Sequence, residues 1–170
     1  NDPMGGYDPY SSSKGCADLL ASSYRNSFFN EKDYGVKHQT LLATCRAGNV
    51  IGGGDWAQDR LICDVMRAAA KNEAVTIRNP NATRPWQHVL EPLSGYLLVG
   101  QKLLEGRKEF GGAWNFGPSD DGAIRVLDVL KSAKRYWDKI EFKIGSDTDQ
   151  PHEANLLKLD CSKAHALLGW

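Results

Sequence analysis

A helix is predicted to begin at Asp8-Pro9-Tyr10-Ser11-Ser12-Ser13-Lys14, close to the start of this 170-residue sequence. Asp8 is the expected N-cap and Pro9 the first helical residue, because a carboxylate there accepts hydrogen bonds from unpaired N–H groups and a proline loses none. Tyr10 and Lys14 then lie on one face, one turn apart. A phenol, with a pKa of roughly 10, is a poor base at neutral pH, but a nearby ammonium favours the phenolate. The pair is therefore a candidate for removing a proton from a hydroxyl group.

The Tyr-x-x-x-Lys spacing is a weak signal when taken alone. With the tyrosine and lysine content of this chain it arises by chance on the order of 0.4 times. A solvated helix start without any catalytic role is the alternative, so the rest of the sequence has to decide.

Composition predicts a soluble globular protein, with 41% hydrophobic and 25% charged residues. The net charge of zero gives no global attraction to a polyanion, although a local group of arginines can still bind a small phosphate-bearing ligand. No apolar run reaches the roughly 18 residues of a membrane span, and no basic-plus-apolar leader is present. The cysteines have no C-x-x-C spacing and are expected to be reduced, buried side chains of a cytoplasmic protein: Cys16, Cys45, Cys63 and Cys161.

Helical and extended patterns alternate along the chain, which indicates an α/β fold. Helices are expected over about 9–30, 59–72 with Asp59 as a possible cap, 92–104, 126–137 and from a cap at Asp160 to Gly169. Strands are expected over 37–47, 74–78, 86–89, 112–118, 140–144 and 156–159.

The first predicted helix carries a broad apolar stripe. Its members recur every three to four residues: Cys16, Ala17, Leu19, Leu20, Tyr24 and Phe28. Such a face suits packing against a partner subunit, and burial within one subunit is an equally good explanation.

Three glycines, Gly52-Gly53-Gly54, follow the expected strand over 37–47 and predict a tight turn or a close backbone approach. They do not form a G-x-G-x-x-G dinucleotide fingerprint, and no Gly-Lys-Ser/Thr of a phosphate-binding loop follows them. A turn that binds no ligand remains the alternative.

One long buried strand is too few for a self-sufficient doubly wound sheet, which needs about four or more. A half-sheet would leave an open edge that costs stability. The chain also begins with Asn1 instead of Met. We therefore expect the later portion of a larger α/β subunit.

Arginines are the most informative polar residues after the Tyr-Lys pair. Each of four lies at a strand end or in a turn, and two are close to tryptophans: Arg46, Arg60, Arg78 and Arg84. Guanidinium groups bind phosphate through paired hydrogen bonds, so together they suggest a pocket for a diphosphate, whereas any one of them alone suits ordinary surface charge.

Two histidines bear on whether the sequence contains a metal site. His88 lies in a strand-like segment and is expected to be a hydrogen-bonded core residue, while His152 lies in a loop and could face a ligand. Neither has a second ligand at zinc spacing, so no metal is predicted.

The sequence resembles the extended short-chain dehydrogenase/reductase family and, within it, the CDP-glucose 4,6-dehydratases, from about residue 3 to residue 170. The most specific segments are RAGNVIGGGDW at 46–56 and TRPWQHV at 83–89. The others are YSSSK at 10–14, DRLI at 59–62, IRNP at 77–80, LEPLSGY at 90–96 and WNFGP at 114–118.

The resemblance implies that 1–170 is the C-terminal portion of one NAD-dependent subunit, comprising the end of a Rossmann-type domain and a smaller sugar-nucleotide-binding lobe. Tyr10 then matches the base that deprotonates the sugar 4-hydroxyl, and Lys14 matches the residue that binds the nicotinamide ribose. The implied reaction oxidises C4 of CDP-glucose, removes water across C5 and C6 and returns the hydride to C6. Substrate-binding residues matched by position are Asn49, Asp55 with the neighbouring Trp56, Arg60, Arg78 and Arg84.

The family's glycine fingerprint and its acid-base pair for water elimination precede the tyrosine, and this chain lacks both segments. The NAD-binding half is thus expected to be absent and the fragment alone inactive. Near the C-terminus, Gln150-Pro151-His152 stands where many relatives have Arg-Pro-Gly. The resemblance further implies a cytoplasmic homo-oligomer, assembled through the Tyr-Lys helix, that supplies deoxysugars for surface polysaccharides such as O-antigen. An NAD-dependent sugar-nucleotide epimerase and a non-catalytic nucleotide-binding fragment remain alternatives.

Overall fold

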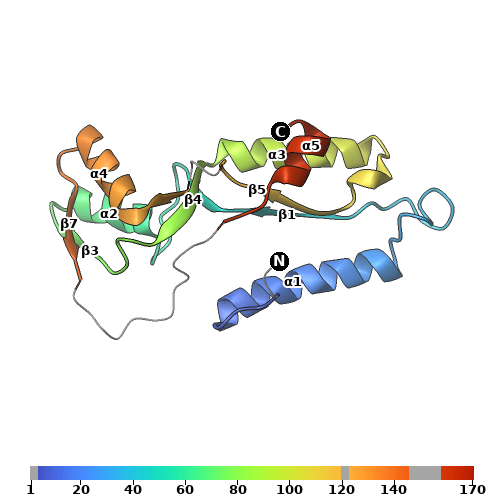
Figure 1. Ribbon diagram of the computed structural model, residues 1–170, viewed down its shortest axis with the longest axis horizontal. Helices are drawn as coiled ribbons and strands as arrows, with labels where there is room; N and C mark the ends of the chain where they lie inside the picture. The colour runs from blue at the N-terminus through green and yellow to red at the C-terminus, as the bar shows by residue number, and fades with distance from the viewer. Residues whose placement is uncertain (1–3, 120–122, 146–157) are drawn as a thin grey trace. The chain divides into compact units, whose positions relative to one another are not determined.

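The computed structural model describes residues 4–119, 123–145 and 158–170. The chain folds into two compact units (Figure 1). The first unit comprises Asn1–Ala47, Leu90–Phe116 and Asp160–Trp170. The second unit comprises Gly48–Val89 and Gly117–Leu159.

The first unit is built on two parallel strands, β1 (Ala43–Ala47) and β5 (Gly112–Phe116), with Cys45 opposite Trp114. Figure 1 shows α3 and α5 on one side of this strand pair and α1 on the other. The helical elements are α1 (Pro9–Ser27), α3 (Leu90–Leu104), the 3-10 turn η1 (Lys108–Phe110) and α5 (Ser162–Leu168).

Aromatic side chains form the core of the first unit. The rings of Phe110 and Trp114 are stacked with centroids 5.9 Å apart, and the Trp114 indole N–H donates to the Phe110 carbonyl at 2.8 Å. Gly95 in α3 lies directly against the ring of Phe116, where any Cβ would overlap that ring. The core therefore depends on the absence of a side chain at position 95.

The second unit contains two small sheets. In one, β4 (Thr83–His88) pairs in parallel with β2 (Asn49–Ile51) and antiparallel with β6 (Ala123–Arg125). In the other, β3 (Ala74–Ile77) pairs in parallel with β7 (Glu141–Ile144). Its helices are α2 (Leu61–Ala70) and α4 (Val126–Tyr136). The buried residues between these elements form one cluster: Val65, Ala69, Ile77, Ala82, Val126, Leu130 and Ile140.

Several predicted bounds are wrong. The strand expected over 37–47 begins only at Ala43, because His38 instead closes a local turn through a 2.9 Å hydrogen bond to the Asn30 carbonyl. Asp59 does not cap α2; it has a φ of 59°, and the N-cap is Arg60. The short strands β2 and β6 were not predicted, and the strand expected over 156–159 lies partly outside the described residues, with 158–159 in no strand.

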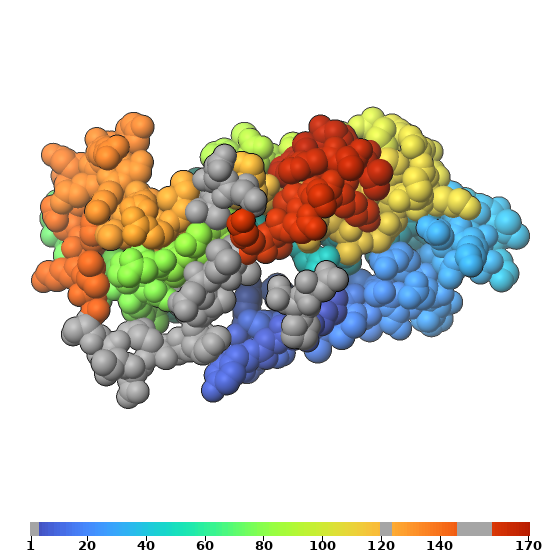
Figure 2. Space-filling model, in the orientation of Figure 1, coloured from blue at the N-terminus to red at the C-terminus, as the bar shows by residue number. Residues whose placement is uncertain are grey.

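The apolar stripe of α1 is not buried by the described residues. Leu20 is 60% exposed and Phe28 63% exposed, and no residue of α1 is buried. Figure 2 shows the helix, in blue, at the surface of the molecule. Across the described ranges no helix is long and apolar enough to span a membrane.

The four cysteines are free, as expected, but only Cys63 and Cys161 are buried. Cys16 lies exposed on α1 and Cys45 is half-buried in β1, so the prediction that all four are buried is wrong.

Candidate functional site

The start of α1 is held by the predicted cap. The Asp8 carboxylate accepts from the Ser11 N–H at 2.9 Å and from the Ser11 hydroxyl at 2.7 Å. These two hydrogen bonds lower the pKa of Asp8 below its ordinary value. Pro9 occupies the first turn, where its missing N–H has no cost. The local sequence therefore fixes the turn that carries Tyr10.

Tyr10 and Lys14 share one face of α1, as predicted. The Lys14 ammonium nitrogen lies 5.4 Å from the centroid of the Tyr10 ring. Tyr10 is 71% exposed, so its hydroxyl is accessible to a ligand. The preceding chain folds back against the helix, where the Ser12 hydroxyl donates to the Gly6 carbonyl at 3.1 Å and a Cβ at Gly15 would lie 3.1 Å from the Gly5 nitrogen. Tyr10 is thus exposed on the first turns of a helix whose start is held in place by the preceding residues.

The glycines around β2 have two different roles. Gly48 and Gly52 allow close approach to another segment of the same chain. A Cβ at Gly48 would lie 2.6 Å from the Pro85 carbonyl oxygen, and one at Gly52 would lie 2.8 Å from a methyl of Val89. Gly54 has a φ of +82°, which favours glycine, and a Cβ on it would meet nothing within 4 Å. The predicted tight turn is confirmed.

Asp55 and Arg60 are brought together by the loop that follows this turn. The Asp55 carboxylate accepts from the Ala57 N–H at 3.1 Å and lies 3.5 Å from the Arg60 guanidinium. The Ala57 hydrogen bond, then Arg60 and the Cys63 thiol, hold the pKa of Asp55 below its ordinary value. Arg60 keeps 63% of its side chain exposed, so it remains available to an anion.

Arg78 and Arg84 lie on other elements of the second unit. Arg78 directly follows β3, and its guanidinium lies 3.7 Å from the Asp59 carboxylate. Arg84 was expected in a turn but lies inside β4, where its guanidinium donates to the Thr83 carbonyl at 3.0 Å. A strand is possible there despite Pro85, because β2 pairs only from Trp86 onward, so at Pro85 the described partner is β6 alone.

The remaining predicted residues have distinct surroundings. Asn49 begins β2 opposite Trp86. Trp56 is 67% exposed in the loop after the glycines. Arg46 lies in the first unit and forms an ion pair with Asp18 at 3.3 Å. The residues predicted to bind substrate, Asn49, Asp55, Arg60, Arg78 and Arg84, all belong to the second unit, whereas Tyr10 and Lys14 belong to the first.

The histidine predictions differ in outcome. His88 is exposed at the end of β4, so the prediction of a core residue is wrong. Gln150 and His152 lie outside the described residues. Within 4–119, 123–145 and 158–170 there is no group of three side chains that could hold a metal ion.

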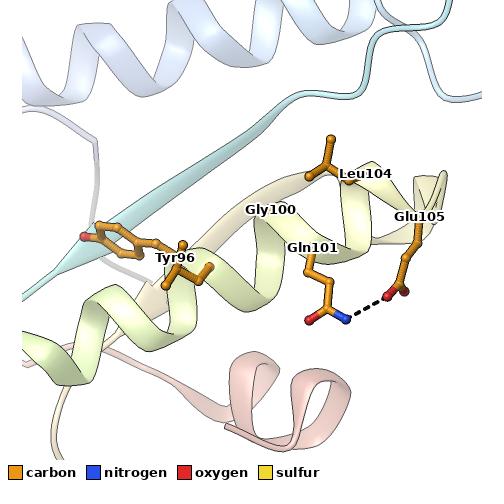
Figure 3. A pocket seen from close by; sticks show the side chains of 6 residues that line it. Tyr96, Gly100, Gln101, Leu104 and Glu105 are labelled. Carbon is orange, nitrogen blue, oxygen red and sulfur yellow. Dashed lines mark hydrogen bonds between the residues drawn. The ribbon is translucent and has the colours of Figure 1, made fainter.

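Two features were not predicted. A shallow, mainly apolar hollow of about 410 Å³ runs along α3 between Tyr96 and Glu105 (Figure 3). It contains none of the predicted site residues; the only signal for it was the apolar spacing of Leu97 and Leu104. The second feature is Arg67 of α2, which donates to the carbonyls of Trp56 and Ala57.

The chain has a Rossmann-type α/β fold that matches about half of each of two solved enzyme structures. UDP-glucuronic acid 4-epimerase from Bacillus cereus matches with a TM-score of 0.76 and 19% identity, over 99% of this chain and 48% of that chain. dTDP-glucose 4,6-dehydratase from Bacillus anthracis matches with a TM-score of 0.72 and 20% identity, over 99% of this chain and 48% of that chain. At these identities the likeness establishes the fold alone.

A sequence relative is more specific. CDP-glucose 4,6-dehydratase of Salmonella typhimurium is 55% identical over all 170 residues, which cover 100% of this chain and 47% of the relative. No family model matches the chain. The chain is therefore similar along its whole length to one portion of that dehydratase, and it spans about half the length of the proteins it matches.

Proposed function

We propose that this chain is the C-terminal portion of an NAD-dependent CDP-glucose 4,6-dehydratase. The observation that carries the proposal is the 55% identity to such an enzyme along the entire chain. The structural matches include an epimerase and a dehydratase with nearly equal TM-scores, so they favour neither activity. The sequence relative favours dehydration of CDP-D-glucose to CDP-4-dehydro-6-deoxy-D-glucose.

The two compact units suggest a domain assignment. The first unit, with its parallel strand pair and the Tyr-Lys helix, would be the end of the NAD-binding domain. The second unit would be the sugar-nucleotide-binding lobe. On this proposal the N-terminal NAD-binding half lies outside the 170 residues, so this portion alone is expected to be inactive.

Tyr10 would act as the general base on the sugar 4-hydroxyl. Its exposed position leaves the phenolic oxygen accessible to the substrate, and Lys14, one turn away on the same face, would bind the nicotinamide ribose. NAD, when bound, supplies the acceptor for the C4 hydride, which is later returned to C6. Water would leave across C5 and C6 through an acid-base pair that the proposal places outside these 170 residues.

The arginines of the second unit would bind the diphosphate. Arg60 and Arg78 are each paired with a carboxylate of the same loop, over 3.5 Å to Asp55 and 3.7 Å to Asp59. Both arginine side chains are more than half exposed, and exposed ion pairs at these distances contribute little free energy. A diphosphate can therefore replace the carboxylates, and Asn49 and Arg84 would contact the same substrate.

The assembly and cellular role are inferred on the same basis. The exposed apolar stripe of α1 suits a homo-oligomer formed through this helix, because Leu20, Tyr24 and Phe28 would otherwise stay in water. A cytoplasmic enzyme supplying deoxysugars for O-antigen agrees with the proposed product.

Product analysis tests the proposal. The complete polypeptide that carries this chain should be incubated with CDP-glucose and NAD, and the product identified by mass spectrometry and NMR. A CDP-linked 4-keto-6-deoxy sugar is expected. A stereoisomer that keeps its 6-hydroxyl would instead identify an epimerase, and no conversion with intact CDP binding would identify a non-catalytic nucleotide-binding protein.

A further inference from the structure

The loop between β2 and α2 has little intrinsic order. Gly53 and Gly54 are consecutive glycines, and a Cβ on either would meet nothing within 4 Å. Asp59 near its other end has a positive φ of 59°, which is uncommon for a residue with a side chain. Residues 52–60 contain no helix or strand. Within the loop, Asp55 contacts Ala57 and Arg60, and contacts from outside the loop can restrict its conformations further.

Arg67 provides such contacts from the body of α2. One guanidinium nitrogen donates to the Trp56 carbonyl at 2.6 Å and to the Ala57 carbonyl at 3.2 Å. The second nitrogen donates to the Ala57 carbonyl at 3.2 Å and pairs with the Asp64 carboxylate, one turn earlier on the helix. The guanidinium thus joins two consecutive loop carbonyls to one helix.

The helix that carries Arg67 is well anchored. Val65 and Ala69, on either side of Arg67 in the sequence, are 1% and 0% exposed in the core of the second unit. Arg67 itself is only 30% exposed. A guanidinium on a packed helix, oriented by Asp64, loses little additional freedom when it binds the loop. The loop is consequently held at Trp56 and Ala57, next to Asp55 and Arg60.

We infer that Arg67 is a positioning residue, which fixes the Asp55–Arg60 loop so that Arg60 is presented to the diphosphate of the substrate. The inference rests on the proposed function for the identity of the ligand, although the loop contacts do not. Positioning the loop requires the planar guanidinium group. A lysine ammonium would keep the positive charge but could not bind the two loop carbonyls and Asp64 in the same geometry.

The alternative is an ordinary helix-surface ion pair between Arg67 and Asp64. Arg107 provides a matched control, because it forms an ion pair with Glu109 at 2.5 Å in the first unit and has no hydrogen bond to a loop carbonyl among the described residues. Replacing the arginine by lysine at both positions keeps the positive charge but removes the planar guanidinium group, so the effects of the two can be told apart.

The test compares wild type, Arg67→Lys, Arg67→Ala and Arg107→Lys in the complete polypeptide that carries this chain. Amide hydrogen exchange of peptides covering 53–60 reports loop order without any ligand. Calorimetry with CDP reports nucleotide binding, and steady-state kinetics with CDP-glucose separates KM from kcat.

Both Arg67 variants should exchange the loop amides about tenfold faster and bind CDP about tenfold more weakly, with a raised KM and kcat within about twofold of wild type. Arg107→Lys should match wild type in every measurement. Unchanged loop exchange in Arg67→Ala, or wild-type binding by Arg67→Lys, would overturn the inference, since the latter result would assign the effect to charge alone. If wild type fails to bind CDP, the proposed function is wrong, and the exchange data still decide whether Arg67 orders the loop.

Discussion

Tyr10→Phe removes one oxygen atom at the centre of the proposed chemistry. The hydroxyl of Tyr10 makes no hydrogen bond among the described residues, and the side chain is 71% exposed. Its removal should therefore leave the free energy of unfolding unchanged within about 0.5 kcal/mol, as for surface substitutions generally. General base catalysis contributes about 10² to 10⁴-fold, so kcat should fall by that factor, equivalent to about 3–5 kcal/mol of activation free energy.

The assay is turnover of CDP-glucose by the complete polypeptide, with thermal unfolding and CDP calorimetry on the same preparations. Tyr24→Phe is the matched control, because Tyr24 lies on the same helix and is 49% exposed but is not part of the pair. Loss of kcat with unchanged unfolding and CDP affinity is expected for Tyr10→Phe only. Full activity in Tyr10→Phe would refute the assigned role, and equal losses in both variants would show that the helix, not the hydroxyl, was responsible.

Three further predictions address the fold, the loop and the diphosphate. Gly95→Ala should destabilise the protein by about 1–3 kcal/mol in denaturant unfolding, because the new Cβ overlaps the Phe116 ring; an unchanged midpoint would contradict the packing. Folding lowers the pKa of Asp55, so the ionised carboxylate stabilises the loop at pH values above its ordinary pKa near 3.8, and this stabilisation is lost as the pH falls through the lower pKa of the folded protein. Protection of the loop amides from hydrogen exchange should therefore decrease over that acidic range in wild type. In Asp55→Asn the protection should not depend on pH. Arg84→Ala should weaken CDP-glucose binding by about tenfold with little change in kcat; unaltered binding by calorimetry would remove Arg84 from the site.

The elements fixed by local chemistry could be predicted from the sequence. The start of α1 was correct because Asp8 and Pro9 satisfy its first turn without any distant contact. The same holds for the end of α5 at Gly169, which has a left-handed φ of 65°. Helices with buried stripes, such as α2, were also identified, since the 3.6-residue period is internal to the segment.

Elements that depend on distant partners could not be predicted. β6 has three residues and is defined only by its pairing with Thr83–Pro85, about forty residues earlier. Arg84 was therefore predicted to lie in a turn, since the adjacent Pro85 is unfavourable in a strand. For the stripe of α1 the sequence left two explanations open, packing against a partner subunit or burial within one subunit, and among the described residues no element covers that face.

The candidate site shows the same division. The Tyr10–Lys14 pair and the glycine turn follow from spacing within one segment, and both predictions of local geometry are confirmed. Arg67 was missed because its contacts with Trp56 and Ala57 join a helix to a loop 10–11 residues earlier. From sequence, Asp64 and Arg67 look like a surface pair at i,i+3 spacing.

Under the proposed function, this chain is about half of an NAD-dependent sugar-nucleotide enzyme. The most direct measurement is the intact mass of the protein purified from its natural source, together with the absorbance spectrum of any nucleotide released on denaturation. A mass close to twice that of the 170-residue chain, with NAD released, is the result predicted by the 47% coverage of the relative. A mass equal to that of this chain, with no nucleotide released, would contradict it.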